Sequence, residues 1–248
     1  MDSEKLQRDH YNNILSEYDA HYDDKFSQRY RSRFIYRWLF EGIDLGGKKV
    51  LEAMCGSGQV TGFLLSLGAE VTGLDISQKA IEAFRARWPK CQSVCDSILG
   101  SKFADNSFDC VVIIGGLHHI HPYVRKAVSE IYRVLKPGGY ICFVEPHKGS
   151  LPDIFRTYWY KHDKLFMENE ASLDIDELKK EFSGRFAVAK ERYAGNIAYL
   201  LVMNSMIFRI PLWMKSVYAP ILLPLESLFE KMMTKGSSCF VISQWRKI

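Results

Sequence analysis

Residues 52–58 combine a carboxylate with two closely spaced glycines, a pattern that indicates a ligand site. The apolar run 49–53 predicts a buried strand, and helical periodicity follows Gly58 through Leu65. Gly56 and Gly58 allow the backbone to turn sharply and to approach a ligand closely. A strand, a small-residue loop and a helix in this order predict a site for a nucleotide-like cofactor.

Three details favour S-adenosylmethionine over a dinucleotide as this cofactor. A dinucleotide site has a small residue three positions after the second glycine, where this sequence has Thr61. Glu52 would repel a pyrophosphate, whereas it suits the ammonium and sulfonium charges of S-adenosylmethionine. No lysine stands at the start of the helix, which excludes a P-loop. The alternative to an S-adenosylmethionine-dependent enzyme is an enzyme of a different class, a nicotinamide-dependent oxidoreductase.

Two further carboxylates follow the next predicted strands. Asp75 ends the run 70–75, and a carboxylate there accepts hydrogen bonds from ribose hydroxyls. Asp96 follows the run 92–95 and is expected to accept from the adenine amino group, with the backbone of Ser97 bonding to the ring; the alternative is a turn-forming aspartate. The cofactor-binding residues that we predict are Tyr22, Glu52, Ala53, Gly56, Gly58, Asp75, Ile76, Asp96, Ser97 and Gly115.

Short apolar runs alternate with amphipathic helices through the first part of the chain, which predicts a parallel sheet with right-handed crossovers. Residues 1–42 are predicted to be helical, and Asp174 is a plausible cap for a later helix. The predicted strands are 49–53, 70–75, 92–95, 108–114, 140–145, 186–193 and 239–245. One predicted helix follows Gly58 and ends at Leu65, and the other predicted helices span 78–88, 124–135 and 175–182.

The spacing of these segments resembles the class I methyltransferases, in particular the group that includes the ubiquinone and menaquinone methyltransferases. The resemblance covers about residues 10–146, and the matching segments are 50–58, 73–77, 94–97, 105–120 and 130–145. It implies S-adenosyl-L-methionine as cofactor and an α/β fold: a Rossmann-like, doubly wound, mostly parallel seven-stranded sheet with an antiparallel last strand, N-terminal helices and a helical insertion before that strand. The group usually has glycine where this sequence has Met54, so either the loop lies farther from the methionine moiety or Met54 points into the core.

The resemblance also implies which residues face the transferred methyl group. His118 and His119 follow the run 108–114 and are candidate bases, needed only if the acceptor must lose a proton; the alternative is a hydrogen bond to backbone. Glu145 and His147 end the run 140–145 and are candidate acceptor contacts, although Glu145 could equally hold a neighbouring loop. Tyr158 is a third candidate contact. It belongs to an aromatic set that either floors an apolar pocket or is core: Phe155, Tyr158, Trp159, Tyr160 and Phe166.

We divide the single predicted domain into an N-terminal helical cap (1–42), a cofactor-binding core (43–146) and a substrate-side half (147–248). The last contains an apolar insertion, 197–235, in which Pro211, Pro220 and Pro224 are predicted to separate short helical pieces. The insertion either packs on the sheet or across a homodimer, or it forms a lid that rests on a membrane. In the second case the cations that meet anionic headgroups are Arg209, Lys215, Lys231 and Lys235.

Composition narrows the class of protein. With 47% hydrophobic and 25% charged residues the chain is typical of globular domains, and its net charge of +4 comes with no basic run interleaved with aromatics, so no nucleic-acid partner is expected. The six cysteines show no CxxC or paired Cys/His spacing, so no metal site is expected. The charged N-terminus and the lack of a long apolar run predict a cytoplasmic protein.

These patterns together predict an enzyme that transfers a methyl group from S-adenosylmethionine to oxygen, nitrogen or carbon of a small-molecule acceptor. They do not determine the acceptor, and an apolar or lipid-like molecule is one option. The alternative is a catalytically inactive module that binds the cofactor and serves for interaction. Met54 in the cofactor loop is the feature that supports the alternative.

Overall fold

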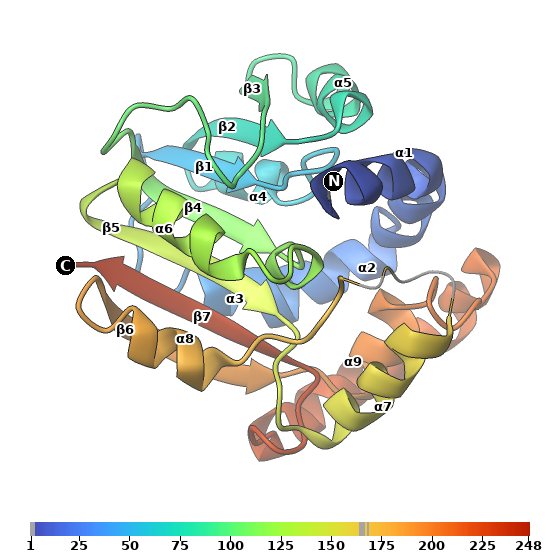
Figure 1. The fold of residues 1–248 in the computed structure, drawn as a ribbon. Helices are drawn as coiled ribbons and strands as arrows, with labels where there is room; N and C mark the ends of the chain where they lie inside the picture. Colours follow the sequence, from blue (N-terminus) through green and yellow to red (C-terminus); the bar gives the residue numbers. More distant parts are fainter. Residues whose placement is uncertain (1–2, 164–166, 168) are drawn as a thin grey trace.

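A computed structural model describes residues 3–163, 167 and 169–248. Its centre is a seven-stranded sheet with the order β3-β2-β1-β4-β5-β7-β6 (Figure 1). The first five strands in this order are mutually parallel, and β7 runs antiparallel to both β5 and β6. The predicted fold is therefore confirmed. The strands are β1 (Lys49–Ala53), β2 (Glu70–Asp75), β3 (Gln92–Cys95), β4 (Phe108–Ile114), β5 (Leu135–Glu145), β6 (Phe186–Ala194) and β7 (Phe240–Lys247).

Helices cover both faces of the sheet, because its central strands are apolar on both sides. On one face, α4 (Thr61–Ser66) and α5 (Gln78–Arg87) pack with the N-terminal helices. On the other face, α6 (Val124–Val134) and α8 (Ile175–Glu181) bury their apolar sides. Each face thus has its own hydrophobic core.

The remaining helices gather at the carboxyl ends of the parallel strands, on the right in Figure 1. This group holds α1 (Ser3–Tyr22) and α2 (Lys25–Tyr30), which come before the sheet, and α7 (Leu151–His162) and α9 (Lys215–Phe229), which come after its fifth strand. A π-helical turn, Arg31–Tyr36, links α2 to the short helix α3 (Arg37–Leu39). Short helical turns span Leu117–His119, Tyr199–Met203, Leu212–Met214 and Glu230–Met232.

The observed bounds of the helices and strands agree closely with the predicted bounds where the hydrophobic pattern of the sequence is strong. The bounds of β1, β2, β3 and β4 are those predicted, and the Asp174 carboxylate caps α8 by accepting the Glu177 N–H at 3.0 Å. Strand β5 starts earlier than predicted, at Leu135, because Gly138 and Gly139 continue the strand through an irregular register with β4.

The insertion differs from its prediction in two ways. Helix α9 is continuous through Pro220 and Pro224, so these prolines do not divide it. Both prolines lie on the exposed side of α9, where water can satisfy the carbonyl groups that lose their N–H partners. The second correction concerns Lys215, which is buried: its ammonium group donates to the Asp24 carboxylate at 2.5 Å and to the Ser27 hydroxyl at 2.9 Å, and cannot meet headgroups.

The buried side of α9 packs against α2, and its other side leaves apolar residues at the surface. No helix within the described ranges combines the length and apolar character needed to cross a bilayer. Membrane contact and a homodimer both stay predictions. The exposed apolar residues of the insertion are Ile197, Leu212, Trp213, Met214, Val217, Ile221, Leu228, Phe229 and Met232.

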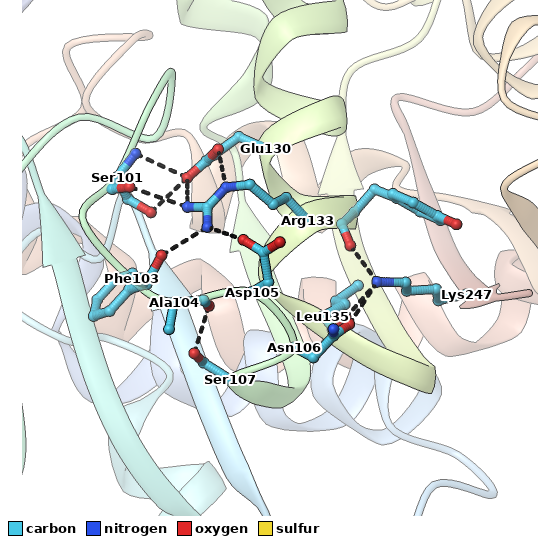
Figure 2. A network of polar contacts seen from close by, with 11 residues as sticks. Ser101, Phe103, Ala104, Asp105, Asn106, Ser107, Glu130, Arg133, Leu135 and Lys247 are labelled. Atoms are coloured by element: carbon cyan, nitrogen blue, oxygen red, sulfur yellow. Dashed lines mark hydrogen bonds and ion pairs between the residues drawn. The ribbon is translucent and has the colours of Figure 1, made fainter.

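Two cations secure the edge of the sheet opposite these helices (Figure 2). The Arg133 guanidinium pairs with Glu130 at 2.6 Å and Asp105 at 2.6 Å, and it donates to the backbone carbonyls of Ser101 and Phe103. The Lys247 ammonium donates to backbone carbonyls at the end of α6 and the start of β5. Glu130 and Arg133 therefore hold the β3–β4 connection, and neither residue lines the cavities described below.

We predict that Gly58→Ala destabilises the protein by roughly 2–4 kcal/mol, the sum of overpacking and left-handed backbone strain. Gly58 has φ +81°, and a Cβ there would lie 2.6 Å from the Trp88 indole nitrogen and 2.7 Å from the Phe84 ring. Urea denaturation measures the change. Gly184→Ala is the control, because a Cβ at Gly184 meets no atom within 4 Å, and an equal effect of both substitutions would contradict the packing argument.

Candidate cofactor and acceptor site

Two cavities meet at the carboxyl ends of the parallel strands. The smaller has a volume of about 130 Å³ and the larger about 760 Å³. Their lining is predominantly apolar, with polar groups from the strand ends. A ligand in one cavity would therefore contact a ligand in the other through a common wall. The residues that line both are Tyr18, Arg31, Ile114, Gly115 and His119.

The smaller cavity runs across four neighbouring strands in their order in the sheet. Asp96 follows β3, Asp75 ends β2, Glu52 lies on β1 and Gly115 follows β4, and all four residues line this cavity. Neighbouring strands lie about 4.8 Å apart, so this row spans roughly 14 Å. An extended adenosyl group with an amino-acid tail has that length scale.

The cofactor loop after β1 brings its backbone to the cavity through left-handed residues. Gly56 has φ +54°, and Met54 has φ +55°, a conformation that costs a non-glycine residue about 1–2 kcal/mol. Met54 lines the smaller cavity and also packs on Gly116, where a Cβ would lie 2.8 Å from the Met54 sulfur. The Met54 side chain therefore forms part of the cavity wall and packs on the loop after β4.

Asp75 is fixed by the backbone of two loops. One carboxylate oxygen accepts the Gly56 N–H at 2.9 Å, and the other accepts the Ser77 N–H at 2.9 Å. Burial raises the pKa of Asp75, and these hydrogen bonds oppose the change. Ser77, not Asp75, caps α5, since its hydroxyl accepts the Ala80 N–H at 3.1 Å. Asp75 is thus left at the cavity with its carboxylate oriented.

Glu52 links the cavity to the start of α4. Its carboxyl accepts the Thr61 hydroxyl and, at 3.3 Å, the Val60 N–H, and it is almost fully buried. Burial raises the pKa of Glu52 to about 7, although the Thr61 hydrogen bond and nearby Arg31 act in the opposite direction. Thr61 occupies the position where a dinucleotide site has a small residue. In this structure its hydroxyl group is a direct hydrogen-bond partner of the Glu52 carboxyl group.

Arg31 was not among the residues predicted from the sequence. It lies at the start of the π-helical turn, is 3% exposed and lines both cavities. Its Nε has no hydrogen-bond partner among the described residues. A lone arginine in a helical segment gives no sequence signal of burial, since most such side chains are solvated.

Three predicted cofactor residues lie outside the smaller cavity. Tyr22 lines the larger cavity and donates to Asn204 at 3.3 Å, and Tyr18, one turn earlier on α1, lines the smaller cavity instead. Gly58 serves the packing of Trp88, and Ser97 lies behind Asp96. The predicted residues that do line the smaller cavity are Glu52, Ala53, Gly56, Asp75, Ile76, Asp96 and Gly115.

Glu145 organises the loop after β4. It is 1% exposed, and its carboxyl group accepts the N–H groups of Gly116 and Leu117, both at 2.8 Å. It also contacts His118 Nδ1 at 2.8 Å. Burial raises the pKa of Glu145 to about 7 and lowers that of His118 well below its usual value, so this contact is a hydrogen bond to a neutral imidazole. The geometry shows the loop-holding role considered for Glu145. Glu145 also lines the larger cavity, so its role as an acceptor contact stays a prediction.

The two histidines lie against each other. Their ring centroids are 3.8 Å apart, and both rings line the larger cavity. His119 Nδ1 lies 3.2 Å from the Glu170 carboxylate. Because His119 also lines the smaller cavity, it is the histidine nearer to the junction.

The other candidate acceptor contacts separate into two groups. His147 is fully buried outside both cavities, where its Nε2 lies 2.9 Å from the Ser238 hydroxyl, so its prediction as an acceptor contact is corrected. Tyr158 lines the larger cavity with a side chain 68% exposed. Phe155, Trp159 and Tyr160 line it too, as an apolar floor requires, and Phe166 lies outside the described residues.

Comparisons with known proteins show that part of the chain is similar to methyltransferases. Residues 51–143 match a family model described as a methyltransferase domain. The chain is 37% identical over 115 residues (45% of this chain and 42% of the relative) to the phthiotriol/phenolphthiotriol dimycocerosates methyltransferase of Mycobacterium tuberculosis. It is 32% identical over 153 residues (59% and 58%) to the demethylmenaquinone methyltransferase of Staphylococcus epidermidis. The chain spans about half the length of the curated relatives it matches.

The fold is shared over a longer stretch. A SAM-dependent methyltransferase structure from Methanosarcina mazei superimposes with a TM-score of 0.57 at 20% identity, covering 82% of this chain and 93% of the other. The central part of the chain is therefore similar in sequence to methyltransferase domains. The sequence match to the family model lies within residues 51–143, and the structural likeness shows that the fold is shared through the later strands.

We predict that Glu52→Gln changes how stability depends on pH. The folded pKa of Glu52 is about 7, above the ordinary value of 4.5, so its contribution is fully present below pH 4.5 and is lost as pH rises through 7. The free energy of unfolding of the wild type should fall across this interval by on the order of 3 kcal/mol more than that of the variant.

Chemical denaturation of the ligand-free protein at pH 5, 6, 7 and 8 measures the difference. Glu70→Gln is the control, because Glu70 is exposed at the opposite end of β2 and should keep the wild-type slope. Parallel profiles for wild type and Glu52→Gln would show that Glu52 titrates normally.

Proposed function

We propose that this protein transfers a methyl group from S-adenosylmethionine to a small, apolar acceptor. The observation that carries the proposal is the junction of the two cavities at Gly115 and His119. In-line displacement at a methyl group requires donor and acceptor to meet across a short, aligned gap. The residues proposed to bind the cofactor line the smaller cavity, and the larger apolar cavity begins beside them at Gly115 and His119. A donor in the smaller cavity and an acceptor in the larger cavity would therefore meet at this junction.

The residues of the smaller cavity suit the parts of the cofactor in sequence. The Asp75 carboxylate, held by Gly56 and Ser77, accepts the ribose hydroxyls, and Asp96 with Ile98 borders the adenine. Glu52 faces the positive amino-acid end. The cofactor supplies an electrophilic methyl group on a sulfonium, with a neutral thioether as the leaving group.

Arg31 completes the amino-acid end. Its buried guanidinium lines the cavity near Glu52, and its Nε lacks a partner among the described residues. A carboxylate is the group that a guanidinium fork binds best. Arg31 and Glu52 would therefore hold the carboxylate and the ammonium of one amino acid, which fixes the direction in which the cofactor lies.

The acceptor is proposed to be apolar because of the walls of the larger cavity. Val144, Met203 and Met206 line it, and the helix α7 adds aromatic side chains at its border. Ile154, Phe155 and Tyr158 on α7 are each at least 65% exposed, which provides an apolar approach to the cavity. The relatives' names, which give demethylmenaquinone and phthiotriol dimycocerosates as acceptors, agree with this chemistry.

We predict that Asp75→Ala weakens binding of S-adenosylhomocysteine by roughly 1.5–3 kcal/mol, or about 10- to 100-fold, because it removes hydrogen bonds to a charged group. Titration calorimetry measures the affinity. Glu70→Ala removes a carboxylate from the other end of the same strand and should leave the affinity unchanged. An Asp75→Ala protein that binds as tightly as the wild type would refute the ribose assignment.

We predict transfer of a labelled methyl group to quinol, phenol or amine acceptors, with kcat/KM rising as an alkyl or prenyl tail is added. Tyr158→Ala should raise KM for the tailed acceptors several-fold while leaving S-adenosylhomocysteine affinity unchanged, since Tyr158 lines only the larger cavity. A protein that binds S-adenosylhomocysteine but methylates no member of the panel would instead be the inactive cofactor-binding module.

A further inference from the structure

Three side chains able to bind a metal converge in the larger cavity. His118, His119 and Glu170 each offer one ligand atom, and these atoms lie within 4.8 Å of one another. The contact between His119 Nδ1 and the Glu170 carboxylate, at 3.2 Å, has the spacing of neighbouring ligands in a coordination shell. All three residues line the larger cavity, so the group faces the space assigned to the acceptor.

Glu170 provides an independent indication of a ligand. Its side chain is 2% exposed, and its Oε2 atom has no hydrogen-bond partner among the described residues. A buried carboxylate oxygen without a donor is costly, and such atoms are rare in folded proteins. A cation bound at this carboxylate would satisfy the oxygen that the chain itself leaves without a donor.

The surroundings of His118 also match those of a metal ligand. His118 Nδ1 lies 2.8 Å from the Glu145 carboxyl, and Glu145 is itself fixed by the N–H groups of Gly116 and Leu117. A carboxylate that accepts one ring N–H fixes the tautomer and leaves the other nitrogen, Nε2, with its lone pair outward. This carboxylate–histidine pair is the usual support of a metal-binding imidazole.

We propose that His118, His119 and Glu170 bind a divalent transition-metal ion, with Zn²⁺ as the ion that best fits two imidazole nitrogens and one carboxylate. Three protein ligands leave a coordination position open toward the larger cavity. From the sequence we expected no metal, because no CxxC or paired Cys/His spacing occurs. Glu170 is far from the two histidines in sequence, so that criterion does not detect this group.

The metal's role rests on the proposed function. A hydroxyl group of the acceptor that binds the open position loses its proton to water more readily, since a bound cation stabilises the resulting oxyanion. That oxygen then uses a lone pair to form the bond to the methyl carbon, while the C–S bond breaks and its electron pair stays on sulfur. The products are the methyl ether, the neutral thioether and one proton.

Calorimetric titration of tag-free, metal-stripped protein with Zn²⁺ tests the site. We expect one ion per chain. Glu170→Gln and His119→Ala should each weaken this binding by at least about 100-fold, more than loss of an outer-shell partner does. Glu145→Gln should weaken it by about 10- to 100-fold, the effect of such a partner. His162→Ala is the control, because His162 is exposed on α7 outside both cavities and should bind as the wild type does.

S-adenosylhomocysteine binding by each variant verifies that it is folded and keeps the two proposals separable. Wild type that binds S-adenosylhomocysteine but not Zn²⁺ would overturn the metal site and leave the methyl-transfer proposal intact. Zn²⁺ binding that is equally strong in Glu170→Gln and His119→Ala would also overturn it. Co²⁺ in place of Zn²⁺ gives a second readout: visible absorption bands of a nitrogen- and oxygen-ligated ion in the wild type, and their loss in the two ligand variants, support the assignment.

Discussion

Parallel pairing of β1 to β5 requires every connection to cross back over the sheet, so all five of these strands end at the same edge. The rest of the structure depends on this constraint. It collects Glu52, Asp75, Asp96 and Glu145 at one edge although they are far apart in sequence. Residues of α1, the turn Arg31–Tyr36, α7 and the segment 199–208 then cover that edge and line two adjoining cavities.

Buried carboxyl groups hold this edge in shape. Asp75 and Glu145 accept backbone N–H groups of the loops after β1 and β4, and Glu52 accepts from the start of α4. A loop that must stay open for a ligand cannot be fixed by packing alone, because packing would fill the space. Hydrogen bonds from its backbone to a buried acid fix the loop without filling the space.

Helices from both ends of the chain complete the larger cavity, and this explains why the two cavities differ. The smaller cavity is made mainly by loops that follow strands of the sheet, whose positions the sheet dictates. The larger cavity is lined by α1, α7 and the insertion. The insertion is tied to the α2 region by contacts such as Lys215 with Asp24 and Tyr30 with Glu226. Such long-range polar pairs leave no periodic signal in the sequence, so Lys215 appeared there as a surface cation.

The sequence by itself determined the α/β fold class, most strand bounds and the positions of Glu52, Gly56, Asp75 and Asp96 at or just after strand ends. Hydrophobic periodicity and loop spacing are local signals, and the rule for parallel sheets then places these loops at one edge. Tertiary structure decided which cavity each remaining residue joins. Tyr18 rather than Tyr22 reaches the smaller cavity, because the rotation of α1 is set by packing. Arg31 is buried and Glu170 meets His119 only because distant helices close over the sheet edge, and no local pattern encodes that closure.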